Sequence, residues 1–200
     1  MSTLTAAAAA AGNGFGSNPL WFATRSTGFM TFVLLTAATA LGIVATQRVA
    51  TARWPRFASQ ALHRNVSLLA VLFLAVHVLT TLLDTYVTIS WWAAVVPFTS
   101  AYRTFDVGLG TLALDILLVV AGTSMMRGVT GHRWWRLVHW TAYAAWPLAL
   151  AHYLGTGTDA RTPWSVGLAT FCLGTVLLAI FVRLGSERRE GPTRLLGGAR

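Results

Sequence analysis

The chain alternates between apolar blocks of roughly 20 residues and short polar segments. A helix of about 20 apolar residues is long enough to cross the hydrocarbon core of a bilayer, which is about 30 Å thick. The pattern therefore predicts five membrane-spanning helices, at residues 20–46, 62–85, 107–126, 137–154 and 164–184. We expect an all-α integral membrane protein that folds as a five-transmembrane-helix bundle.

Composition supports this interpretation and divides the chain into three parts. Hydrophobic residues make up 55% of the sequence, the mean hydropathy is +0.60, and only 10% of residues are charged. A soluble domain carries about a quarter charged residues. Residues 20–184 form the expected membrane domain. Residues 1–19, rich in Ala, Gly, Ser and Asn, predict a flexible N-terminal tail, and residues 185–200 a basic cytoplasmic tail.

The basic residues predict the orientation in the membrane. The net charge is +9, and all 15 basic residues are arginine. Twelve of them fall at one end of the expected spans and three, Arg25, Arg103 and Arg161, at the other. Cytoplasmic loops collect positive charge. We therefore expect a multi-pass plasma-membrane protein in contact with lipid, its N-terminus outside and its C-terminus in the cytoplasm. Arginines confined to short loops between apolar spans argue against nucleic-acid binding.

Two pairs of histidines lie inside the apolar blocks. His63 and His77 are 14 residues apart in the second expected span, and His139 and His152 are 13 apart in the fourth. Both spans run in the same direction, so His63 and His139 share the inner side and His77 and His152 the outer side. Ionisable residues inside a bilayer are costly and usually functional, and imidazole is a common haem ligand. The pattern indicates two haem groups, each held by two histidines.

The spacing of the second pair leaves a geometric mismatch. At about 100° per residue, 14 helical steps end roughly 40° from the starting direction, whereas 13 steps end about 140° away. Pro147 lies between His139 and His152, and a proline kink can redirect one of them. The alternative is that these histidines form hydrogen bonds between helices.

Further residues are candidates for roles around these sites. Haem propionates need cationic partners, and arginine binds carboxylates well. Arg64 and Arg136 are candidates at the inner side and Arg103 and Arg161 at the outer side, with membrane orientation or lipid binding as the alternative. Asp115, well inside the third span, fits an ion pair, a proton or quinone site, or a structural hydrogen bond. His132 is expected to be a loop residue.

Cysteine content limits the possible cofactors. Cys172 is the only cysteine, which rules out an intramolecular disulfide and a cysteine-based iron–sulfur site. No C-x-x-C-H motif is present, so a haem would be bound without a covalent link. The sequence also lacks a Gly-rich dinucleotide loop and a βαβ pattern. We therefore expect electrons to come from a separate donor.

Two segments carry a resemblance to a known family: LHRNVSLLAVLFLAVH at 62–77 and GHRWWRLVHWTAYAAWPLALAHYLGTG at 131–157. They resemble the ferric reductase-like transmembrane domain family. It includes the membrane parts of ferric reductases and NADPH oxidases and the haem-binding subunit of periplasmic methionine sulfoxide reductase. The resemblance implies two haem b (heme b) groups per chain, with His63 facing His139 and His77 facing His152. It implies electron flow from an inner-side quinol or flavoprotein to outer ferric iron or a redox protein.

We therefore expect a membrane oxidoreductase subunit that carries electrons across the bilayer. Two other functions remain open at this point. One is a haem-binding or haem-sensing membrane module without turnover. The other is a membrane protein whose histidines bind a metal ion or relay protons.

Overall fold

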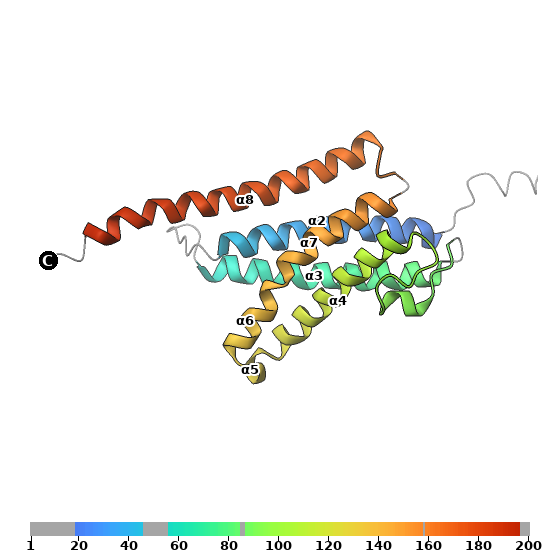
Figure 1. Ribbon diagram of the computed structural model, residues 1–200, viewed down its shortest axis with the longest axis horizontal. Coiled ribbons are helices and arrows are strands. Elements are labelled where there is room, and N and C mark those ends of the chain that lie inside the picture. Colours follow the sequence, from blue (N-terminus) through green and yellow to red (C-terminus); the bar gives the residue numbers. More distant parts are fainter. Residues whose placement is uncertain (1–18, 46–55, 85–86, 158, 197–200) are drawn as a thin grey trace, which may run out of the picture.

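The computed structural model describes residues 19–45, 56–84, 87–157 and 159–196, and every regular element in these ranges is a helix (Figure 1). Most of the expected tail at 1–19 lies outside the described residues. The helices are α2 (Pro19–Ala45), α3 (Arg56–Leu83), η1 (Trp91–Ala94), α4 (Thr104–Met125), α5 (Arg127–Thr130), α6 (His132–Trp140), α7 (Ala142–Thr156) and α8 (Pro163–Leu196).

Within the described ranges, four helices are long and apolar enough to cross a membrane. The qualifying segments are Pro19–Ala45, Phe57–Leu83, Thr104–Met125 and Pro163–Ser186. They correspond to the first, second, third and fifth expected spans, and they confirm an all-helical, multi-pass membrane protein. The fourth expected span, 137–154, differs from expectation. It is divided into two shorter helices, α6 and α7, which meet at Thr141.

The junction at Thr141 is overwound. The Thr141 N–H donates to Val138 O at 3.0 Å, and the Ala144 N–H donates to Thr141 O at 2.9 Å. Both bonds span three residues, as in a 3₁₀ helix, which turns about 120° per residue instead of about 100°. The residues on either side of Thr141 are α-helical, so the tighter turning is local to this junction. It rotates α7 in the sense that reduces the roughly 140° mismatch between the two histidines.

The sequence predicts that a kink at Pro147 redirects one of the two histidines, and this stays a prediction. Pro147 lies inside α7, and the helix continues through it to Thr156. A proline in a helix removes one N–H and crowds the carbonyl four residues before it. Here that carbonyl belongs to Tyr143, so the disturbance falls next to the Thr141 junction. The tightening therefore precedes the proline by one to two turns.

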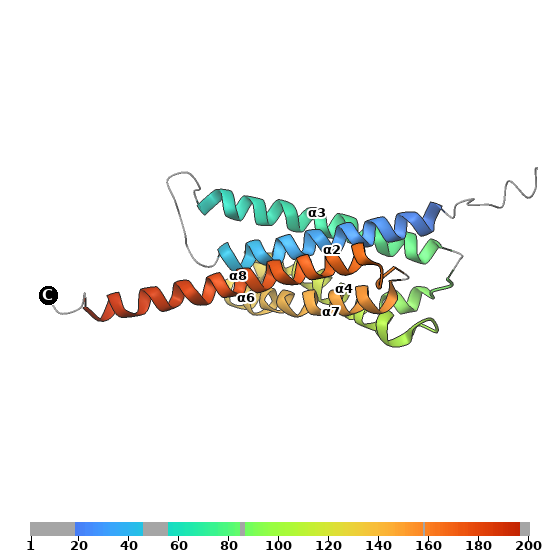
Figure 2. The same cartoon turned by 90° about the horizontal axis from the view of Figure 1, so that it is seen from above.

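The long helices form two pairs with α8 on the outside. α2 packs along α3, and α4 packs along α7 and the end of α6 (Figures 1 and 2). α8 packs on α2, and it continues beyond the expected span to Leu196. α3 makes few contacts with α7. A gap therefore separates the α2–α3 pair from the α4–α7 pair on the side where the histidines lie.

The core is concentrated between α2, α7 and α8. Phe32 stacks on Trp146 and Tyr153, with ring centroids 6.0 and 5.1 Å apart. The Trp146 indole N–H donates to Thr36 Oγ1 at 2.9 Å, and Cys172 is buried in the same cluster. This core fixes α7 against α2. It thereby sets the depth of the histidines that α7 and its continuation α6 carry.

Candidate functional site

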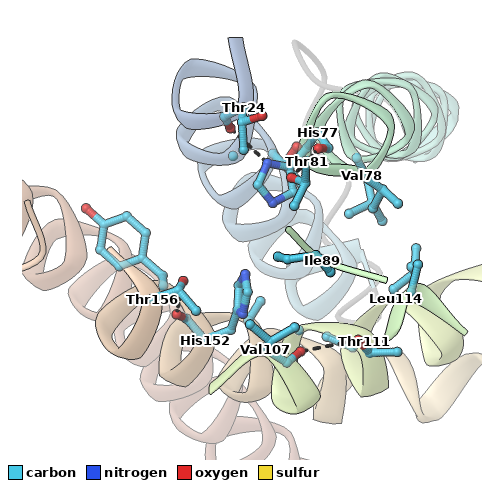
Figure 3. Close-up of a pocket in the computed structure, with 18 of the residues that line it drawn as sticks. Thr24, His77, Val78, Thr81, Ile89, Val107, Thr111, Leu114, His152 and Thr156 are labelled. Atoms are coloured by element: carbon cyan, nitrogen blue, oxygen red, sulfur yellow. Dashed lines mark hydrogen bonds between the residues drawn. The ribbon is translucent and has the colours of Figure 1, made fainter. Parts of the chain in front are cut away.

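The two histidines of each pair lie opposite each other across the opening between the helix pairs, with their ring planes nearly perpendicular. The His63 and His139 ring centroids lie 6.1 Å apart with an angle of 83° between the ring planes. The His77 and His152 centroids lie 6.5 Å apart at 76°. Figure 3 shows His77 from α3 and His152 from α7 pointing toward each other across a cavity. The four predicted ligands are thus assembled in the predicted pairs.

Each pair leaves room for one metal ion between its rings. Two metal–imidazole bonds of about 2 Å, plus the distance from each nitrogen to its ring centre, give roughly 6 Å. In the described part of the chain no group of three or more His, Cys, Asp or Glu side chains could hold a metal ion. A bare ion needs three or four protein ligands. Two opposed imidazoles alone fit a metal whose equatorial positions are filled by a macrocycle, which is the case of haem.

Hydrogen bonds fix the tautomer of three of the four histidines. In each, Nδ1 donates to a backbone carbonyl of the neighbouring helix. The bonds join His63 to Ala38 at 3.0 Å, His77 to Thr24 at 2.8 Å and His152 to Asp106 at 2.8 Å. A carbonyl only accepts, so Nδ1 carries the hydrogen and Nε2 keeps its lone pair. Such a bond orients a metal-binding histidine and raises its basicity.

The same three rings lie against glycines in a repeated arrangement, which we call the glycine seat. In each seat the carbonyl acceptor precedes the glycine by four residues, and the imidazole covers the glycine. A Cβ built on the glycine would lie 3.3 Å from His63 Cε1 at Gly42, 2.9 Å from His77 Cε1 at Gly28, and 2.5 Å from His152 Nδ1 at Gly110. A side chain at Gly28 or Gly110 would force the ring away from the carbonyl, whereas one at Gly42 would only crowd it.

The sequence carries a signal for two of these seats that histidine spacing alone does not reveal. Gly28 and Gly42 are 14 residues apart on α2, the same spacing as His63 and His77 on α3. α2 and α3 are consecutive, antiparallel helices, so equal spacings on both place each glycine opposite one histidine. Gly110 has no partner of this kind, and its seat depends on how α4 packs against α7.

His139 is the exception among the four. Its Nδ1 is buried and has no hydrogen-bond partner in the described part of the chain. The Trp135 ring stacks on it instead, with centroids 5.0 Å apart and 24° between planes. The Trp135 indole N–H donates to Ser124 Oγ on α4 at 3.2 Å. The Trp135 ring therefore positions the His139 imidazole, a role that a backbone carbonyl has for the other three histidines.

The outer pair lies in a cavity of about 290 Å³ that is lined by α2, α3, η1, α4 and α7. Apolar side chains such as Leu74, Val78 and Leu114 form most of its wall. The polar groups are few, among them Thr81 and Thr156. A largely apolar cavity with two convergent nitrogens suits a large, flat, apolar macrocycle, so the residues present fit a haem.

The candidate arginines are distributed around the ends of the bundle. Arg64 and Arg136 are exposed, on α3 and α6, and Arg161 is exposed in the segment between α7 and α8. Arg103 precedes α4, and its guanidinium donates to the carbonyl of Gly155. None of these four lines the outer cavity. Their assignment to the propionates stays a prediction.

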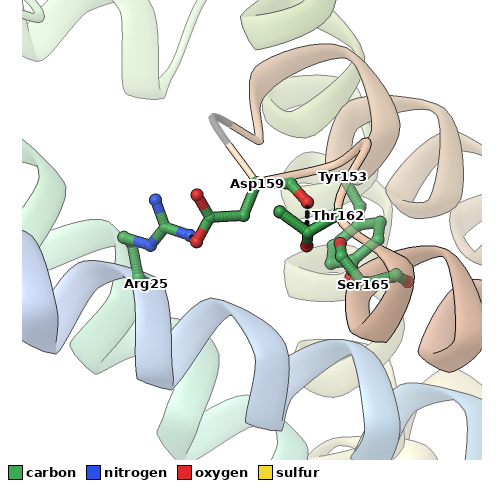
Figure 4. Close-up of polar contacts among 5 residues, drawn as sticks. All are labelled: Arg25, Tyr153, Asp159, Thr162 and Ser165. Atoms are coloured by element: carbon green, nitrogen blue, oxygen red, sulfur yellow. Dashed lines mark hydrogen bonds and ion pairs between the residues drawn. The ribbon is translucent and has the colours of Figure 1, made fainter.

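Arg25, the third outer arginine, lines the cavity and forms an ion pair with Asp159 (Figure 4). Its guanidinium also lies over the Trp21 ring, 4.4 Å from the centroid. Thr162 Oγ1 donates to Asp159 O at 2.7 Å. The pair thus ties the first turns of α2 to the segment that joins α7 and α8, at the rim of the outer cavity.

Two other predicted residues have defined positions. His132 was expected in a loop, but it is the first residue of α6, exposed, with its ring 5.4 Å from that of Trp135. It belongs to neither facing pair. Asp115 lies within α4 and is half-buried. It does not line the outer cavity.

The fold and the paired histidines define a multi-pass helical membrane protein with two facing imidazole pairs. The chain belongs to the family described as ferric reductase like transmembrane component, whose model matches residues 27–150, more than half of the chain. The match includes His63, His77 and His139 and ends two residues before His152. No significant match was found among curated proteins or solved structures. Members of the family typically bind haem, and membership implies electron transfer in the membrane by an oxidoreductase component.

Proposed function

We propose that this chain is a membrane cytochrome b that carries electrons across the bilayer through two haem b groups. His63 and His139 are the ligands of the inner haem, and His77 and His152 those of the outer haem. The observation that carries the proposal is the pair of facing imidazoles, 6.1 and 6.5 Å between ring centres, at two depths of one helical bundle.

The side chains account for electron transfer without substrate binding at the metal. When bound, haem supplies a one-electron ferric–ferrous couple. With the two histidines of a pair as its ligands, a bound haem would have no open coordination position. The glycine seats keep Nε2 of His63, His77 and His152 unprotonated and directed at the site, so no proton has to leave these ligands. The wall of the outer cavity is largely apolar, as suits the macrocycle of a haem.

The same proposal sets the topology and the partners. α6 and α7 together act as a fifth crossing, because residues 132–156 rise about 37 Å as a helix. The N-terminus is outside and the C-terminus in the cytoplasm of a plasma membrane. A quinol or a separate flavoprotein on the inner side donates electrons, and ferric iron or a redox protein on the outer side accepts them. Arg64 and Arg136 are the proposed inner propionate partners and Arg103 and Arg161 the outer ones.

The decisive test is a reduced-minus-oxidised absorbance spectrum of the purified protein with haem quantified per chain. We expect a b-type spectrum with both axial positions filled by nitrogen, and about two haems per chain. Reduction by a quinol or flavoprotein followed by reoxidation by an outer acceptor would separate electron transfer from haem sensing. A protein without haem, produced with ample haem supply, would overturn the proposal and favour a metal-ion or proton-relay function.

The ring angles predict a magnetic signature. When two axial imidazole planes are perpendicular, the iron orbitals that overlap with them are nearly equal in energy, and the low-spin ferric signal becomes strongly anisotropic. The 83° and 76° angles therefore predict two such signals by electron paramagnetic resonance of the oxidised protein. A rhombic signal typical of parallel imidazoles would contradict the geometry of that pair.

A further inference from the structure

The four imidazoles differ in the hydrogen bonds of their Nδ1 atoms, and the difference lies in the inner pair. Both outer histidines, His77 and His152, donate Nδ1–H to a carbonyl. In the inner pair His63 does so, whereas His139 Nδ1 is buried without an acceptor. The described part of the chain thus provides two hydrogen-bonded ligands at the outer site and one at the inner site.

His139 is positioned by another residue. Trp135 is one turn before His139 on α6, stacks on its ring at 5.0 Å, and is itself tied to Ser124 of α4. The neighbouring Trp134 is 71% exposed and does not take part in this contact. The stack restricts the ring's rotation, but a stacked indole does not accept the Nδ1 hydrogen.

We propose that Trp135 is the positioning residue of His139, and that the inner site has the higher reduction potential because His139 lacks a hydrogen-bond acceptor. The proposal rests on the proposed function, since it takes the four histidines as axial ligands.

The basicity of the histidine ligands determines which site has the higher reduction potential. A histidine whose Nδ1–H is donated becomes a more basic ligand and stabilises the more positive, ferric iron. The outer site has two such ligands and is the harder to reduce. The inner site has one, so with haem bound at both sites a single shared electron would reside mainly at the inner site. Trp135 and Ser124 contribute to this difference in potential, because they hold His139 in a position where its Nδ1 has no acceptor.

The first experiment measures each potential alone by spectroscopic redox titration. His77→Ala leaves the inner haem and His63→Ala leaves the outer haem. We expect the inner haem to be favoured at least tenfold, which is about 59 mV for a one-electron couple. Equal potentials, or a higher outer potential, would overturn the proposed order. If the unaltered protein binds no haem, the proposed function itself fails, and the two failures are therefore distinguishable.

The second experiment tests Trp135. Trp135→Leu removes the stack and opens space beside His139, so that water can accept the Nδ1 hydrogen. We expect the inner potential to fall and the inner magnetic signal to change, with the outer haem unaffected. Trp135→Phe keeps an aromatic ring but loses the bond to Ser124, and it should give an intermediate shift.

Trp134→Leu is the matched control and should change neither haem. A purely structural role of Trp135 would lower thermal stability and leave the inner potential and signal as they are, which would refute the positioning role. Selective loss of the inner haem in Trp135→Leu supports positioning, and Trp135→Phe then carries the potential measurement.

Discussion

Replacing any one of the four paired histidines by alanine is expected to remove one haem and leave the other. His63→Ala and His139→Ala should each abolish the inner haem, and His77→Ala and His152→Ala the outer haem. Each variant should retain about half of the haem of the unaltered protein. The reason is that the rings of each pair are 6.1 or 6.5 Å apart, and no third ligand-type side chain joins either pair in the described residues. One remaining imidazole cannot replace the lost axial bond.

Haem content per chain and the magnetic signal of the remaining haem check this result. His132→Ala is the matched control, because His132 is exposed and outside both pairs, and it should retain both haems. Two haems retained in any of the four variants would contradict that residue's assignment. Loss of the same haem by His63→Ala and His152→Ala would contradict the pairing.

Alanine in the glycine seats is expected to be damaging in a graded order. At Gly110 the added Cβ would lie 2.5 Å from His152 Nδ1, at Gly28 2.9 Å from His77 Cε1, and at Gly42 3.3 Å from His63 Cε1. Contacts under about 3 Å force the ring or the helix to move, whereas the contact at Gly42 needs a shift of a few tenths of an ångström. Overpacking of this kind typically costs about 1–3 kcal/mol. We expect Gly110→Ala and Gly28→Ala to lose the outer haem, and Gly42→Ala to keep the inner haem.

The control lies on the same helix as Gly110. A Cβ at Gly122 would meet nothing within 4 Å, so Gly122→Ala should keep both haems and full thermal stability. Haem content and the melting temperature of each variant provide two independent readouts. Equal haem content and equal melting temperature of Gly110→Ala and Gly122→Ala would contradict the packing of the His152 imidazole against Gly110.

The main features of the fold could be predicted from the sequence because they depend on local composition. Four of the five expected spans coincide with long apolar helices, since a run of apolar residues needs no distant partner to identify it. The fourth span was harder, because Thr141 and Pro147 interrupt regular hydrogen bonding within it. The 13-residue spacing indicated that a straight helix would direct His139 and His152 to different sides. It did not indicate where along the helix the tighter turn would lie.

The candidate site was predicted in part for the same reason. Histidines are rare inside apolar segments, so two at similar spacing on each of two spans can be recognised as candidate ligands. The groups that contact these histidines could not be recognised in the same way. The carbonyls that accept from His63 and His77 are 25 and 53 residues away in the chain, and any residue can supply a carbonyl. Nothing in the sequence distinguishes Trp135 from the nearby Trp134 and Trp140, which are residues of the same type.

The sequence by itself indicated which segments are long and apolar enough to cross a membrane, where the arginines gather, and which four imidazoles are candidate ligands. These are consequences of the hydrophobic effect and of the cost of burying charge, which act on each segment separately. The tertiary structure decided which backbone groups meet those imidazoles: carbonyls beside three glycines, and an indole beside His139. Such contacts depend on the register between helices, and only packing of the whole bundle fixes that register.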